Sequence, residues 1–223
     1  MRRYNKKQLM IYIFILVITC ILKMPYITEI IDDYSLIPFN IVVYYSKNNY
    51  INFVWLIPIV ASSFILTSTL YYKLINFDVR FKNRYRYLLE LLKDNLWSSI
   101  LFALFTTIMQ WLIFAIYFKF NIEINEMLCI IIIKYALEIY LLSISILIIS
   151  LLINNFIYSY VIIISIIIIL INSFRVPFFP FVNLYCDYNI NIIDIIMVFI
   201  LVLLIKSIYE KKDLGGAKNE IDC

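Results

Sequence analysis

The sequence contains no histidine and only two glycines among its 223 residues. Without histidine the chain cannot build a metal centre from imidazole ligands, which are the commonest metal ligands in proteins. Both glycines, Gly215 and Gly216, lie near the C-terminus, and no GxxxxGK[ST] motif occurs. A P-loop needs such a glycine-rich turn to cradle nucleotide phosphates, so we expect no nucleotide or other cofactor in this chain.

Cysteines and catalytic groups are also sparse. The four cysteines fall in separate segments without CxxC spacing, which excludes a zinc knuckle: Cys20, Cys129, Cys186 and Cys223. No Ser/His/Asp or Cys/His arrangement is available, and the adjacent carboxylates of Asp32 and Asp33 are no evidence for acid–base catalysis by themselves. Composition therefore argues against an enzyme.

Charge is scarce and hydrophobic residues are abundant. Charged residues make up 15% of the chain, against about 25% in ordinary soluble domains. Hydrophobic residues make up 64% and occur in long runs that contain almost no charge. Since a spanning helix needs about 20 predominantly apolar residues, the sequence predicts a membrane protein with several spans.

Six segments have the composition of spanning helices. We expect them over residues 8–24, 53–72, 98–118, 128–152, 156–172 and 192–209. They predict an all-α, six-span domain over residues 1–209, followed by a polar tail over 210–223. Residues 25–52 contain two prolines and three acidic residues, and we expect them to form a polar loop.

Lysine and arginine are divided unequally between the two ends of the expected spans. Fourteen lie at the N-terminus, between the second and third spans, or after the sixth, whereas four flank the opposite ends. Cytoplasmic loops carry an excess of these residues, so both termini are expected in the cytoplasm. The net charge of +4 is explained by this topology and by anionic lipid, without nucleic acid as a partner.

A basic segment, RFKNRYRYLLELLKDNLW, occupies residues 80–97 between the second and third spans. Its apolar side chains recur at helical steps: Phe81, Tyr85, Leu88, Leu89, Leu92 and Leu96. Charged side chains, among them Arg80 and Arg84, occupy the remaining positions, and Trp97 marks the headgroup boundary. We expect an amphipathic cytoplasmic helix whose leucines enter the acyl boundary alone or also pack against a soluble partner.

Polar side chains within the expected spans form a second group of candidates. Lys134 and Glu138 lie one helical turn apart, either as a pair at the outer boundary or as part of a substrate path. The remaining candidates offer small hydroxyl or amide groups: Ser62, Ser63, Thr67, Thr106, Thr107 and Gln110. They either join helices by hydrogen bonds or line a cavity between two protomers.

Six spans, cytoplasmic termini, a basic segment between spans two and three and a short outer loop after span three together resemble the permease subunit of ABC-2-type exporters. The segment NFDVRFKNRYRYL, residues 76–88, is especially similar to the small Gram-positive members. In that family the loop between spans two and three contacts the nucleotide-binding subunit. The resemblance assigns this contact to the following residues: Arg80, Phe81, Arg84, Tyr85, Leu88, Leu89 and Leu92.

The resemblance also implies partners and a location. A second permease chain, identical or related, would pair with this one in the bacterial cell membrane, and a separate ATPase subunit would bind ATP and magnesium. The expected cargo is hydrophobic or amphipathic, such as a peptide, a bacteriocin or a drug-like molecule. Two alternatives stay open: a six-span capture subunit of an energy-coupling importer, and a bacteriocin immunity protein that acts alone.

Overall fold

The computed structural model describes residues 6–33, 49–77, 84–118, 126–173 and 192–211. Every element within these ranges is an α-helix, which confirms the all-α prediction for this part of the chain. The six helices are α1 (Lys6–Asp33), α3 (Asn49–Phe77), α4 (Arg84–Phe118), α5 (Glu126–Ile153), α6 (Phe156–Ser173) and α8 (Ile192–Lys211). Each contains one of the six expected spans or most of it.

Four of the described helices are long and apolar enough to cross a membrane. The segments that meet this criterion are Lys6–Pro25, Ile57–Ile75, Tyr85–Tyr117 and Ile132–Ile153. Helices α6 and α8 contribute shorter apolar stretches, Phe156–Ile168 and Ile195–Tyr209. Many large hydrophobic side chains on the outer faces of these helices are exposed, as expected for surfaces that meet lipid.

Two helices extend beyond their expected ends. Helix α1 continues through Pro25 to Asp33, so the first residues of the expected polar loop are helical. A proline removes one backbone donor but does not have to end a helix, because a bend can accommodate its ring. Helix α3 likewise begins at Asn49 and ends at Phe77, several residues outside the expected span at each end.

Helix α4 is the largest departure from the prediction. The basic segment was expected to form a separate surface helix, but Arg84–Phe118 is one continuous helix of 35 residues. The described part of the basic segment is therefore the first portion of the third spanning helix. Good helix formers, Leu, Glu and Lys, occupy residues 88–93, and neither glycine nor proline interrupts the junction with the apolar run.

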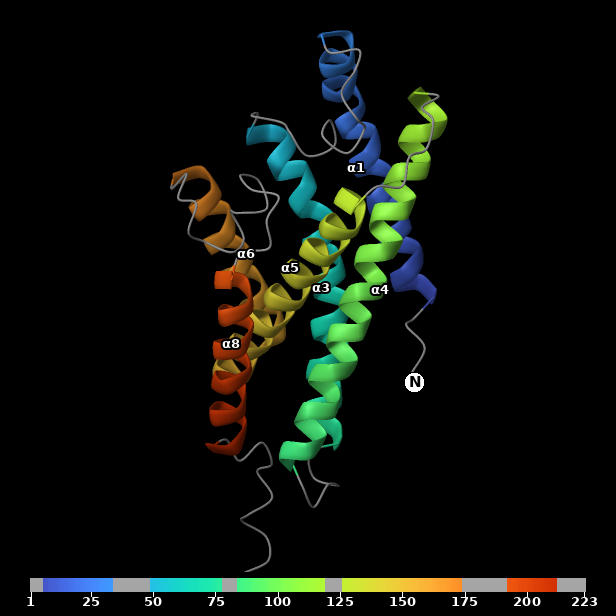
Figure 1. Cartoon of the computed structure of the whole chain (residues 1–223). Helices are drawn as coiled ribbons and strands as arrows, with labels where there is room; N and C mark the ends of the chain where they lie inside the picture. The colour runs from blue at the N-terminus through green and yellow to red at the C-terminus, as the bar shows by residue number, and fades with distance from the viewer. Residues whose placement is uncertain (1–5, 34–48, 78–83, 119–125, 174–191, 212–223) are drawn as a thin grey trace, which may run out of the picture.

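Helix α5 lies in the middle of the bundle (Figure 1). It packs against α3, α4, α6 and α8, while α1 packs against α3 and α4. The candidate span of α5 is 72% buried, against 28% for that of α1. Most of the α5 span is therefore covered by other helices, so a polar side chain on α5 is more often enclosed by protein than one on α1.

A two-residue turn joins α5 to α6. Asn154 has a positive φ of 59°, the left-handed conformation that asparagine tolerates better than most residues. The side-chain oxygen of Asn155 then accepts hydrogen bonds from the backbone N–H groups of Ile157 and Tyr158 at 3.0 and 3.2 Å. This cap satisfies donors at the start of α6 that have no partner within the helix.

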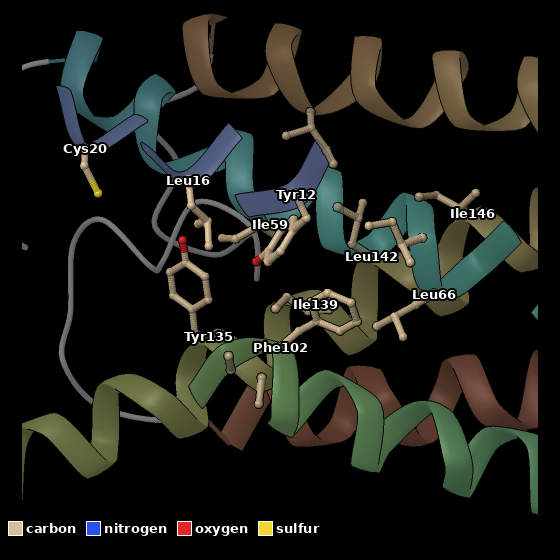
Figure 2. Close-up of a cluster of buried hydrophobic side chains, with 14 of the residues drawn as sticks. Tyr12, Leu16, Cys20, Ile59, Leu66, Phe102, Tyr135, Ile139, Leu142 and Ile146 are labelled. Atoms are coloured by element: carbon tan, nitrogen blue, oxygen red, sulfur yellow. The ribbon is translucent and has the colours of Figure 1, made fainter. Parts of the chain in front are cut away.

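The buried side chains form two clusters, which we name by their positions in Figure 1. The upper core joins α1, α3, α4, α5 and α6, and Figure 2 shows part of it, with Tyr12 of α1 beside Ile59 and Phe102. The lower core joins α3, α4, α5 and α8 through residues that are mostly aliphatic. Its members are Leu70, Leu74, Leu88, Leu91, Leu92, Tyr140, Ile144, Leu147, Ile148, Leu151, Ile205 and Tyr209.

Candidate functional site: a buried polar layer

Two ionisable side chains are buried on α5. Lys134 is 5% exposed and Glu138 is 2% exposed, and their spacing of four residues puts them on one face of the helix. Both lie near the start of the candidate span Ile132–Ile153. The sequence left open whether this pair lies at the outer boundary or on a substrate path, and the structure shows that both side chains are buried within the bundle.

A cluster of hydroxyl groups joins three other helices at the upper core. The hydroxyl of Tyr12 on α1 is hydrogen-bonded to Oγ1 of Thr106 on α4, and the Ser62 hydroxyl of α3 lies close by. The ring of Tyr12 packs edge-on against Phe102, with 5.1 Å between ring centroids. Tyr12 thus connects α1 to both α3 and α4 through one side chain.

The contact between α3 and α5 sets their relative depth. The single hydroxyl proton of Thr67 is shared between the carbonyl oxygen of Ser63 in α3, at 2.7 Å, and that of Ser143 in α5, at 3.3 Å. Both helices run in the same direction in Figure 1, so five residues toward each N-terminus lead to Ser62 and Glu138 at about the same depth. Glu138 therefore lies at the level of the Tyr12 hydroxyl cluster.

The same register places Gln110 and Lys134 at one level. Helix α4 runs opposite to α5 (Figure 1), and Thr106 is at the level of Glu138. One turn further along α4 is Gln110, and one turn back along α5 is Lys134. Gln110 is 3% exposed, so an amide, an ammonium and a carboxylate occupy two adjacent levels of the bundle. We call these two levels, with Thr106, Gln110, Lys134 and Glu138, the buried polar layer.

Most of the candidate hydroxyls donate to their own helix. Ser62 and Ser63 donate to the carbonyl oxygens three residues earlier at 2.9 and 2.8 Å. Thr67 and Thr106 donate to those four residues earlier, each at 2.7 Å. Such bonds satisfy the hydroxyl proton and leave the oxygen able to accept a further hydrogen bond.

The structure brings seven of the eight predicted path residues into the interior. Thr107 is the exception, because it is only half-buried. The buried members are Ser62, Ser63, Thr67, Thr106, Gln110, Lys134 and Glu138. They are covered by helices of their own chain, so the described arrangement gathers them within one protomer.

The predicted coupling residues are divided between interior and surface. Arg80, Phe81 and the side chain of Arg84 lie outside what the structure describes. Tyr85 and Leu89 are 40% and 41% exposed, whereas Leu88 and Leu92 are buried in the lower core. Two of the leucines expected at the membrane surface thus pack against the protein's own helices.

Sequence reasoning missed the buried stripe of α4. Its members follow one another in steps of three and four residues: Leu88, Leu92, Asn95, Ser99, Ala103, Thr106, Gln110 and Phe114. The signal was present in the polar residues, which share this face while Leu89, Trp97, Leu101, Ile108 and Leu112 occupy exposed positions. In a membrane helix the polar stripe, not the apolar one, indicates the protein interior.

Two further buried residues were not identified as candidates. Lys23 on α1, one of the four cations counted at the outer ends of the expected spans, is 1% exposed. Asn95 on α4 is 2% exposed, and neither its side-chain nitrogen nor its oxygen has a hydrogen-bond partner among the described residues. Within the same ranges no three His, Cys, Asp or Glu residues gather in a way that fits a metal ion.

Comparison of the chain with protein-family models, with curated proteins and with solved structures finds no match.

Proposed function

We propose that this chain is the permease subunit of an ATP-driven exporter of the ABC-2 type. The observation that carries the proposal is the buried polar layer at Glu138 and Lys134, inside a bundle whose outer faces are apolar. Charged groups within membrane spans are costly and mark transport paths in many membrane proteins. A protein that only anchored to the membrane would have no need of them.

In this proposal all six described helices cross the membrane. Helices α6 and α8 have 18 and 20 residues, close to the length that a span requires. The excess of lysine and arginine at the N-terminus, before and at the start of α4, and toward the C-terminus favours a cytoplasmic position for both termini and for the start of α4. Two permease chains, as in the resembling family, alternate between inward-open and outward-open packing and move a hydrophobic or amphipathic cargo.

The start of α4 provides the contact with a separate ATPase that binds ATP and magnesium. Its exposed side chains combine apolar and cationic groups: Tyr85, Arg86, Leu89 and Lys93. Because α4 is one helix from Arg84 to Phe118, a displacement at its exposed start is transmitted to Thr106 and Gln110 in the polar layer. A continuous helix suits this role better than a hinged pair of helices.

Purification of the tagged chain in mild detergent tests the proposal. We expect an ATPase to copurify in stoichiometric amount, and to be stimulated by the chain in liposomes. A tightly bound small molecule without an ATPase would instead indicate a capture subunit, and neither partner would indicate a protein that acts alone, such as an immunity protein. Either of these results would overturn the exporter assignment.

A variant at the proposed contact tests the coupling. Leu89→Glu places a charge on a side chain that is 41% exposed, so the bundle should still fold while ATPase stimulation is lost. Leu89→Met is the matched control and should retain stimulation. Leu92 is unsuitable for this purpose, because it is 3% exposed and a glutamate there would be buried in the lower core.

A further inference from the structure

Two amide side chains on α4 are buried without complete hydrogen bonding. Both polar atoms of Asn95 and the side-chain nitrogen of Gln110 have no partner among the described residues. These residues are 2% and 3% exposed. Buried amides in proteins nearly always have a hydrogen-bond partner, and the requirement is strictest where lipid surrounds the protein. A partner of another kind is therefore needed at both positions.

The two amides belong to one column of polar groups. Ser99 and Thr106 lie between them on the buried stripe of α4, and both are fully buried. Fifteen positions separate Asn95 from Gln110, which corresponds to about 22 Å along the helix. This distance covers most of the hydrocarbon thickness of a bilayer, about 30 Å.

Helix α5 supplies polar groups opposite the column. Gln110 and Thr106 are level with Lys134 and Glu138, as derived above. The antiparallel register continues to the other end, where Asn95 is level with residues 149 and 150 of α5. Ser150 is fully buried there and donates to the carbonyl oxygen of Ile146 at 2.7 Å. Each amide of α4 thus faces a level of α5 that also carries a polar side chain.

The hydroxyls along this column retain capacity to accept hydrogen bonds. Ser99 and Thr106 donate to carbonyl oxygens of α4 at 2.9 and 2.7 Å. The Ser99 oxygen keeps both lone pairs for a small donor, whereas the Thr106 oxygen, which is already hydrogen-bonded to Tyr12, keeps one. The amide nitrogens are hydrogen-bond donors, and the Asn95 oxygen is an acceptor. A ligand that satisfies them must therefore both donate and accept hydrogen bonds.

We propose that ordered water within a single chain binds at the two amide ends of this column, at Asn95 and at Gln110. The column consists of Asn95, Ser99, Thr106 and Gln110 of α4 with Lys134 and Glu138 of α5. Water is the smallest ligand that both donates and accepts, and buried water commonly satisfies such groups. These waters lie inside one protomer, not between two, and the proposal does not depend on the exporter assignment or on an ATPase.

Single cysteines in the column test this proposal. The four natural cysteines are first replaced by serine, and Asn95→Cys and Gln110→Cys are then made separately in the full chain. Leu96→Cys and Leu112→Cys are the controls, because these neighbours on α4 are 37% and 40% exposed on the outer face. Each protein is placed in liposomes, and alkylation by N-ethylmaleimide is followed by mass spectrometry.

Hydrated cysteines should react faster than lipid-facing ones, because the thiolate is the reactive form and needs water to exist. We expect alkylation at positions 95 and 110 to be about tenfold faster than at 96 and 112. Equal or slower alkylation at both column positions would show that the interior is dry and overturn the proposal. If Asn95→Cys fails to insert, Ser99→Cys, a nearly isosteric change, replaces it under the same criterion.

Discussion

The upper and lower cores use the same three helices, α3, α4 and α5, but different chemistry. In the lower core Leu74 and Leu88 meet Leu147 among other, mostly aliphatic side chains. In the upper core the helices meet through the Tyr12 hydroxyl cluster and beside the buried charges of α5. Packing of apolar side chains depends on shape, whereas polar partners can be exchanged for one another. In the proposed transport cycle we therefore expect the lower core to hold the bundle together and the upper core to rearrange.

The largest expected effect comes from a charge in the upper core. Glu138→Leu leaves the buried ammonium of Lys134 without the carboxylate on its own helix face, and should lower the free energy of unfolding by about 3 to 5 kcal/mol. The double variant Lys134→Met with Glu138→Leu should recover most of that loss. Reversible unfolding in mixed micelles with increasing dodecyl sulfate measures both. If the loss of stability in the double variant equals the sum of the losses in the two single variants, the two side chains are not coupled.

The lower core should respond to the loss of volume. Leu88 is 1% exposed and Leu89 is 41% exposed, so the two neighbours form a matched pair of positions. Leu88→Ala should cost about 2 to 4 kcal/mol because it leaves a cavity between α3, α4 and α5. Leu89→Ala should cost less than about 1 kcal/mol. Equal losses of stability for Leu88→Ala and Leu89→Ala in the same unfolding measurement would contradict the burial of Leu88 in the lower core.

A smaller effect is expected from one hydroxyl of the upper core. Tyr12→Phe keeps the ring contact with Phe102 but removes the hydrogen bond to Thr106. Interhelical hydrogen bonds in membranes contribute about 0.6 kcal/mol on average and at most about 1.7. Tyr72→Phe is the control, since Tyr72 is 65% exposed and should not change stability. If Tyr12→Phe lowers the free energy of unfolding as much as Leu88→Ala does, the upper core depends on specific contacts as strongly as the lower core, and the proposed difference between them is wrong.

The smallest expected effect lies at the edge of the lower core. The ammonium of Lys206 on α8 sits 4.4 Å from the ring centroid of Tyr85 at the start of α4. Tyr85→Leu removes this cation–π contact and should cost about 0.5 to 1 kcal/mol. Lys206→Met should cost the same amount, and the double variant no more than either. If the losses of the two single variants add in the double variant, the contact between Tyr85 and Lys206 does not stabilise the packing of α4 against α8.

The sequence predicts the helices well because their signal is local. Runs of apolar residues bounded by polar ones identify a helix in each of the six places. The end of the fifth expected span at residue 172 and the end of α6 at Ser173 differ by one residue. The capping side chain of Asn155 and the turn at Asn154 lie beside each other in the chain, so such boundaries need no knowledge of distant contacts.

The inward faces were harder to predict, because apolar residues occur all around these helices. Leu88 and Leu89 are chemically identical in the sequence, yet one is buried and the other exposed. The difference depends on which neighbours α4 meets, namely α3, α5 and α8. The polar residues Asn95, Thr106 and Gln110 indicate the correct face, but only when their spacing is examined separately from that of the leucines.

The turn at Asn154 and Asn155 has a consequence for biosynthesis. In the proposed six-span topology two residues are too few to cross the bilayer between these helices, so we expect α5 and α6 to enter it together as one hairpin. Helix α6 packs against α5, so α5 then has a neighbouring helix from the moment of insertion. Lengthening this turn would let α5 meet lipid alone with its charges uncovered. We therefore expect insertion in the turn to reduce the yield of the protein before it affects any activity.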